Sequence, residues 1–138
     1  MIEADELWSF VGHKGRVAWV WAALDADTRQ VVAMAVGDRS ADTARRLWDV
    51  RPCRSRDRAL ACTDFWSADR AAIPAERPAA AGTEAGRTCH VERFWRTLRQ
   101  RCARLVRTTL SFPNCPRNHL GALWDFIRRY NRTRRCRP

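Results

Sequence analysis

Alternating polar, aromatic and β-branched residues mark the first third of the chain as strands. Residues 5–11 and 17–24 are rich in Trp, Val and Phe, and residues 30–36 form a third run of similar character. Gly12 ends the first run, and the turn residues 25–29 separate the second from the third. Because the connections are short, the three runs predict an antiparallel meander.

The middle of the chain predicts one helix and one buried strand. Ser40 is a favoured N-cap residue with an acid two residues later, so residues 41–48 are expected to be helical. Residues 59–63 form a short apolar run of the kind that lies in the centre of a sheet. A short helix is expected over 66–73, and the small residues of 79–86 predict a loop.

Two amphipathic helices are predicted in the last third. The first begins near Thr88 or Cys89, because one stripe of residues recurs at the helical period: Val91, Phe94, Trp95, Leu98, Cys102 and Leu105. The second is expected over 117–130, with four residues facing inward: Leu120, Leu123, Trp124 and Ile127. The order β-β-β-α-β-α predicts an α/β fold with a mixed sheet and flanking helices, as one domain over 1–131 with a frayed basic tail over 132–138.

Length and composition restrict the class of protein. The 138 residues are 46% hydrophobic and 30% charged, which is typical of one folded domain and excludes a disordered or fibrous chain. The apolar runs are shorter than the roughly 20 residues of a membrane span, and no signal segment opens the chain. A cytoplasmic protein is therefore expected.

Cysteine and histidine spacing argues against a zinc module or a nucleophilic site. The six cysteines form no Cys-x-x-Cys pair, and without a secretory segment they are expected to be reduced. His13, His90 and His119 are scattered, so packing or surface positions are expected for them. No Ser-His-Asp or Cys-His arrangement is defined.

Positive charge is concentrated in the last third. The 26 basic and 15 acidic side chains give a net charge of +11, and Lys14 is the one lysine among the basic residues. Residues 1–50 carry 6 basic and 8 acidic side chains, whereas residues 92–138 carry 13 and 2. Guanidinium groups bind phosphate bidentately, so this distribution favours a nucleic-acid partner. A GC-rich genome also replaces Lys by Arg, but that bias alone does not explain the asymmetry.

Three carboxylates are candidates for one metal site. Asp5 lies on the first predicted strand, Asp64 directly follows the buried strand, and the helix that carries Glu92 can lie across both. Converging carboxylates repel one another and a divalent cation relieves that cost; Mg²⁺ suits such a site because water and phosphate oxygens complete its shell. Taken singly, Asp5 is better explained as a solvated acid near a terminus, and Glu92 as a carboxylate that the helix dipole favours; the order of the motifs below reverses that preference.

Six short motifs follow one another along nearly the whole chain: Asp5-Glu6-Leu7-Trp8 with Lys14 and Trp19, Gly37-Asp38-Arg39-Ser40, Thr63-Asp64-Phe65-Trp66, Val91-Glu92-Arg93, Leu98-Arg99-Gln100-Arg101 and Leu110-Ser111-Phe112. In this order they resemble the transposase of the insertion sequence one family. The resemblance implies a DDE transposase catalytic domain with an RNase H-like fold. It assigns Asp5, Asp64 and Glu92 as the ligands of Mg²⁺ or Mn²⁺, and Arg99 as the basic residue beside the acid.

The implied activity is DNA-mediated transposition, in which one site cleaves a DNA strand and then transfers it. The expected partners are the transposon ends and the target DNA. Five basic residues are expected to contact DNA phosphates without reading sequence: Lys14, Arg93, Arg96, Arg104 and Arg107. Because transposition joins two ends in one complex, a homodimer is consistent with this activity, although no residue of the sequence defines an interface.

Departures from the family pattern keep two other hypotheses open. Four residues precede Asp5, so the sequence resembles a second-frame product whose zinc-finger and helix-turn-helix part comes from an upstream frame. The loop of residues 77–83 lacks the His and Lys of relatives, Asp69 replaces an aromatic residue and Trp95 a small polar one. These departures are also consistent with an inactive transposase remnant or with a non-catalytic basic DNA-binding protein.

Overall fold

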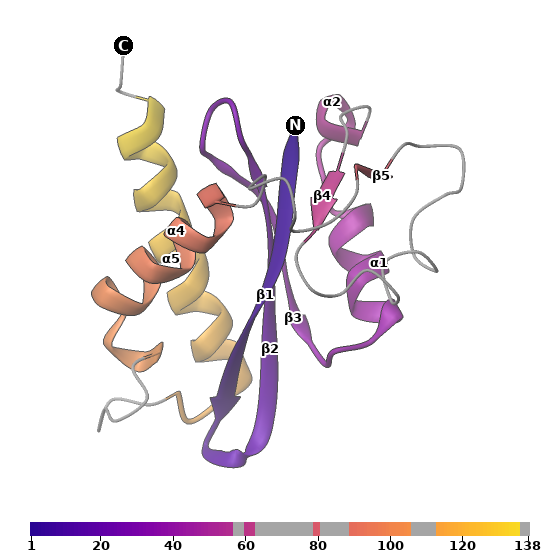
Figure 1. Ribbon diagram of the computed structural model, residues 1–138. Helices are drawn as coiled ribbons and strands as arrows, with labels where there is room; N and C mark the ends of the chain where they lie inside the picture. The colour runs from indigo at the N-terminus through magenta and orange to yellow at the C-terminus, as the bar shows by residue number, and fades with distance from the viewer. Residues whose placement is uncertain (57–59, 63–78, 81–88, 106–112, 136–138) are drawn as a thin grey trace.

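A mixed sheet runs through the centre of the computed structural model, with helices on both of its faces (Figure 1). The structure describes residues 1–56, 60–62, 79–80, 89–105 and 113–135. The expected helix 66–73 therefore lies outside the described residues, as do residues 81–86 of the expected loop.

The sheet has the strand order β3-β2-β1-β4-β5. Strands β1 (Ile2–Val11), β2 (His13–Asp25) and β3 (Val31–Gly37) pair antiparallel, which confirms the predicted meander. Strand β4 (Leu60–Cys62) pairs parallel with β1, so its predicted position inside the sheet and the α/β class are also confirmed. Strand β5 (Ala79–Ala80) is a correction, because these two residues were expected in a loop. They pair with β4, and a pairing between distant segments leaves no periodic signal in two alanines.

Helices α1 (Ala41–Asp49) and α2 (Cys53–Arg56) lie on one side of the sheet, and α4 (Cys89–Arg101) and α5 (Pro116–Arg135) on the other (Figure 1). A 3₁₀ turn over Ala103–Leu105 follows α4. The apolar stripe of α4 is buried at Val91, Phe94, Trp95 and Leu98, which confirms the predicted inner face. No helix in the described ranges is both long and apolar enough to cross a membrane.

The predicted N-cap of α1 is confirmed. The Ser40 hydroxyl accepts a hydrogen bond from the Thr43 amide at 3.5 Å, and the Asp38 carboxylate accepts bonds from the Ser40 and Thr43 hydroxyls. These hydrogen bonds stabilise the charged carboxylate and lower the pKa of Asp38 below its ordinary value. The Thr43 side chain packs directly against the backbone of Gly37. A larger residue would not fit there, since a Cβ atom at position 37 would lie 2.6 Å from the Thr43 hydroxyl oxygen.

The inner face of α5 is narrower than the sequence predicts. Leu123 and Ile127 are buried as expected, but Leu120 and Trp124 are 40% and 39% exposed. Helix α5 packs beside β3, the edge strand of the sheet, so only a narrow stripe reaches the core. The helix also continues to Arg135, so the expectation of a frayed segment from residue 132 is wrong for residues 132–135.

Asn131 joins α5 to the edge of the sheet. Its side-chain oxygen accepts a hydrogen bond from the Val31 amide at 2.9 Å, and its side-chain nitrogen donates one to the Val31 carbonyl at 2.9 Å. The amide therefore pairs with β3 as a neighbouring strand would, which protects an edge that otherwise invites pairing with other chains.

Replacement of Asn131 by Ala is expected to lower the free energy of unfolding by about 2 kcal/mol, because both Val31 groups lose their partner in a part-buried position. Urea denaturation followed by circular dichroism measures this change. Asn118→Ala, on an exposed position of the same helix, is the control and should change stability by less than about 0.5 kcal/mol. Equal effects of the two variants would contradict the role given to Asn131.

Candidate active site

Strand β1 presents alternate side chains to the two helical layers. The Glu3 carboxylate contacts the start of α4, and Leu7 lies in the hydrophobic cluster that contains the buried residues of α4 and α5. Glu6 faces the other way and accepts hydrogen bonds from the Arg39 guanidinium at 2.7 and 3.0 Å. Because side chains alternate along a strand, half-buried Asp5 shares the α4 face with Glu3 and Leu7.

Glu3 fixes the first turn of α4 against β1. One oxygen of its carboxylate accepts hydrogen bonds from the backbone amides of His90 and Val91, at 2.9 and 2.8 Å. Both amides belong to the helix start, where backbone donors lack helical partners and a negative charge is favoured. Glu3 is 1% exposed, so these bonds form away from bulk water.

Glu92 follows this anchored turn directly and is exposed. The structure thus brings Asp5 and Glu92 to the same side of the sheet, because Glu3 lies two residues before Asp5 and its bonding partner Val91 lies next to Glu92. Asp64 lies outside the described residues. Strand β4 ends at Cys62, which pairs with Ala4, the residue before Asp5. The carboxyl end of β4 therefore lies beside Asp5.

The candidate DNA-contacting residues fall into two groups. Arg93, Arg96 and Arg99 are exposed on α4, and Arg99 lies two turns after Glu92, about 10 Å along the helix axis. Lys14 is exposed near the start of β2, eight residues or roughly 26 Å of strand from Ala22, which pairs with Asp5. The structure therefore does not bring Lys14 close to the carboxylates. The Arg104 side chain and Arg107 lie outside the described part.

A cluster of three possible metal ligands was missed in the sequence. The ligand atoms of Glu3, Cys89 and His90 lie within 4.8 Å of one another, and the Cys89 sulfur is 3.8 Å from His90 Nδ1. Spacing rules do not find such a cluster because Glu3 is distant in sequence. Its carboxylate is already engaged by two amides at a helix start, where the positive end of the dipole opposes a cation. The geometry thus assigns Glu3 to anchoring α4.

Comparison with known proteins shows the family to which the chain is related. Residues 1–131 match the family described as IS1 transposase. Insertion element iso-IS1n protein InsB of Shigella dysenteriae is 31% identical over 128 residues, 93% of this chain and 94% of that protein. Insertion element IS1 protein InsB of Shigella sonnei is 32% identical, over 91% and 92%. Insertion element IS1 4 protein InsB of Escherichia coli (strain K12) is 32% identical, over 91% and 72%. No solved structure matches the chain significantly.

These matches extend over nearly the whole chain and place it among the proteins of insertion elements. The chain belongs to the IS1 transposase family, which confirms the resemblance carried by its six motifs. Membership of this family connects the chain with DNA transposition and recombination.

Proposed function

We propose that this chain is the catalytic domain of a DDE transposase, which cleaves and joins DNA strands with a divalent metal, Mg²⁺ or Mn²⁺. The observation that carries the proposal is the Glu3 anchor, which holds Glu92 on the same side of the sheet as Asp5. The strand order β3-β2-β1-β4-β5, with β1 to β3 antiparallel and β4 parallel to β1, supports an RNase H-like fold.

The carboxylates suit a hard cation. Asp5 is half-buried and Glu92 exposed, so neither lies sealed inside the core. Asp64, the third proposed ligand, follows Cys62 by two residues, and the covalent chain limits that separation to about 7 Å between Cα atoms. Carboxylate oxygens are the ligands that Mg²⁺ and Mn²⁺ prefer. When bound, the cation would activate the attacking hydroxyl and stabilise charge on the phosphate.

The basic residues would hold DNA against these carboxylates. Arg99 is exposed on the same face of α4 as Glu92, since seven residues complete almost two helical turns, and we assign it to a phosphate near the reacting one. Arg93 and Arg96 supply further exposed guanidiniums on this helix. Lys14, at the far end of β2, would contact DNA well away from the cleaved bond, and Arg104 and Arg107 keep their proposed role as phosphate contacts.

A thermal melt with and without Mn²⁺ tests assembly of the carboxylates without any requirement for transposon ends. At about ten times the dissociation constant, Mn²⁺ is expected to stabilise the folded chain by about 1.4 kcal/mol, which corresponds to a rise in Tm of about 5 °C. Asp64→Asn should remove the rise. Asp125→Asn, a change of the same type at an exposed position of α5, should keep it.

The two open alternatives give different results in this melt. An inactive remnant or a non-catalytic DNA-binding protein would show no Mn²⁺-dependent rise in a wild-type chain that unfolds cooperatively. A rise that Asp64→Asn leaves unchanged would place the cation elsewhere and would contradict the proposed ligands. Cleavage of DNA in the presence of a chelator would contradict metal dependence itself.

A further inference from the structure

A small basic pocket lies where the start of α4, the end of α5 and the turn between β2 and β3 meet. Figure 1 shows these three segments together at the end of the molecule that carries the N-terminus. The pocket has a volume of about 240 Å³ and is lined by Arg29, His90, Arg93, Tyr130 and Arg134. Since water occupies about 30 Å³ per molecule in the liquid, this space holds one tetrahedral oxyanion with several waters.

The three guanidiniums of this pocket have no acidic partner among the residues that the structure describes. Three ion pairs of those residues involve other groups: Asp27 with the N-terminus, Glu6 with Arg39, and Asp125 with Arg129. Three positive charges that line one small space repel one another, and an anion between them reverses the sign of the interaction. The charge distribution therefore favours an anionic ligand.

Arg134 is held in place with a donor still to be satisfied. Its guanidinium lies over the Tyr130 ring, 4.7 Å from the ring centroid, and Tyr130 in turn makes an edge contact with the buried Phe94 ring. Stacking uses the flat face of the guanidinium and leaves its N–H groups available to acceptors. The Arg134 Nε–H group is buried without a hydrogen-bond partner, a situation that folded proteins rarely leave without a ligand or water.

Arg29 occupies a backbone position that suits a smaller residue. Its φ angle is +57°, in the left-handed region that favours Gly or Asn, and its amide donates a hydrogen bond to the Asp25 carbonyl at 2.7 Å. The Asp25 carboxylate also accepts bonds from the Asp27 amide and the Thr28 hydroxyl, which fixes the turn. A strained arginine on a rigid turn is typical of a functional position.

We propose that this pocket binds one phosphate group of the DNA backbone and thereby orients the strand that approaches the carboxylate site. Arg93, which lines the pocket, precedes Arg96 and follows Glu92 within one turn of α4, so a phosphate bound here lies within one helical turn of the proposed ligand Glu92 along the helix axis. His90 and Tyr130 add hydrogen-bonding groups next to the three guanidiniums. The assignment of DNA as the source of the phosphate rests on the proposed function.

Fluorescence anisotropy of a labelled DNA duplex, measured with the full chain over a series of salt concentrations, tests this proposal. The variants are Arg29→Gly, Arg134→Gln and their combination. Each is expected to weaken DNA binding roughly tenfold and to lower the slope of log K against log salt by about one. Because both arginines serve one phosphate, the combined variant should also lose about one unit of slope and not two.

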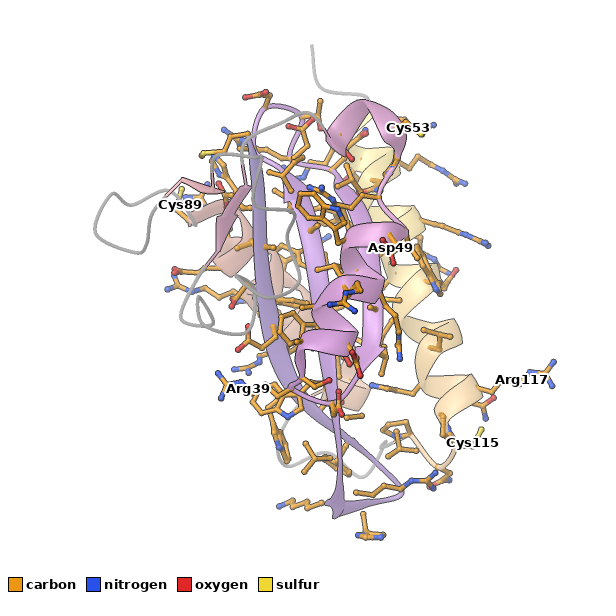
Figure 2. All side chains as sticks on the ribbon, turned by 90° about the vertical axis from the view of Figure 1, so that its right-hand side faces the viewer. Arg39, Asp49, Cys53, Cys89, Cys115 and Arg117 are labelled. Carbon is orange, nitrogen blue, oxygen red and sulfur yellow. The ribbon has the colours of Figure 1, made fainter. Side chains whose placement is uncertain are left out.

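Two further measurements separate a binding role from a structural one. Glycine is favoured at a φ of +57°, so Arg29→Gly should unfold at the same temperature as the wild type or higher while it binds DNA more weakly. Arg117→Ala is the matched control, because Arg117 is exposed at the first turn of α5, far from the pocket. Figure 2 shows this separation: Arg117 lies well away from Cys89, which begins α4 next to the pocket residue His90. It should leave the affinity within about twofold of the wild type.

Three outcomes would overturn the proposal. The first is wild-type affinity and slope in the combined variant, and the second is an equal loss in Arg117→Ala. The third is that inorganic phosphate raises the Tm of the wild type but not of the combined variant, while both proteins bind DNA equally well. That result would assign the pocket to a free oxyanion. If the pocket variants bind DNA with wild-type affinity and still cleave it in the presence of metal, the pocket proposal is rejected and the catalytic function stands. Weakened DNA binding in a chain that never cleaves would reject the catalytic function and keep the pocket.

Discussion

Replacement of Asp5 by Asn is expected to slow metal-dependent DNA strand cleavage by about 10³-fold or more. Glu6→Gln, in contrast, is expected to change the rate of cleavage little. The two acids are adjacent in sequence and lie on opposite faces of β1. Asp5 shares the face of the strand that α4 covers, where Glu3 anchors the helix start. Loss of one carboxylate ligand removes much of the charge stabilisation that a bound cation supplies to the reacting phosphate, which accounts for the size of the effect.

Glu6 has a structural role on the other face. Its side chain is 5% exposed and accepts two hydrogen bonds from Arg39, whose guanidinium lies over the Trp19 ring at 4.6 Å. Glu6→Gln keeps the shape of the side chain but removes the charge that Arg39 pairs with. The expected consequence is a lower Tm with little change in the rate of cleavage by the folded protein.

Nicking of supercoiled plasmid in Mn²⁺, at saturating protein, measures both rates without defined transposon ends. Circular dichroism at the assay temperature confirms that each variant is folded. Asp5→Cys sharpens the test, because a thiolate is a poor ligand for Mg²⁺ and a better one for Mn²⁺. This variant should be inactive in Mg²⁺ and partly active in Mn²⁺. Equal losses in the Asp5 and Glu6 variants would show that the choice between the two acids is wrong.

Local patterns predicted the parts of this fold that local physics determines. The three long strands, the Ser40 cap and the buried stripe of α4 follow from alternation, capping chemistry and helical periodicity, all of which act within a few residues. Two alanines carry no such pattern, so β5 was expected in a loop although it pairs with β4. Leu120 and Trp124 were misplaced because the width of a helix's buried face depends on the element beneath it, here an edge strand.

The candidate site shows the same division. Sequence motifs selected Asp5 and Glu92 as candidate metal ligands, but alternation alone did not show which of two neighbouring acids, Asp5 or Glu6, faces α4. Contacts with the α4 amides and with Arg39 supply that distinction. The basic pocket was not predictable, since Arg29, His90 and Arg134 come from three separate elements and meet only after the sheet and both helices are packed.

Glu3 provides the largest expected effect on stability. Replacement of Glu3 by Ala is expected to lower the free energy of unfolding by about 3 kcal/mol, because one buried and one part-buried backbone donor at the start of α4 lose a charged acceptor. Glu3→Gln retains an oxygen acceptor but loses the favourable interaction of the charge with the helix dipole, and should cost about half as much. Urea denaturation measures both changes.

Hydrogen exchange locates the effect within the molecule. In Glu3→Ala the amides of His90 and Val91 should exchange much faster than in the wild type, whereas the amide of Cys102, bonded to the Leu98 carbonyl at the other end of α4, should change only with global stability. Asp125→Asn, which breaks an exposed ion pair on α5, serves as the control and should cost less than about 0.5 kcal/mol. Unchanged protection of His90 and Val91 in Glu3→Ala would contradict the anchor.

The anchor also connects stability with the proposed chemistry. Glu92 lies one residue beyond an amide that Glu3 holds, so a frayed helix start displaces this carboxylate relative to Asp5. Glu3→Gln should therefore reduce the rate of plasmid nicking even at temperatures where the variant is fully folded, and a higher Mn²⁺ concentration should recover part of the loss. A purely structural Glu3 would lower the Tm without any change in the Mn²⁺ dependence of the folded protein.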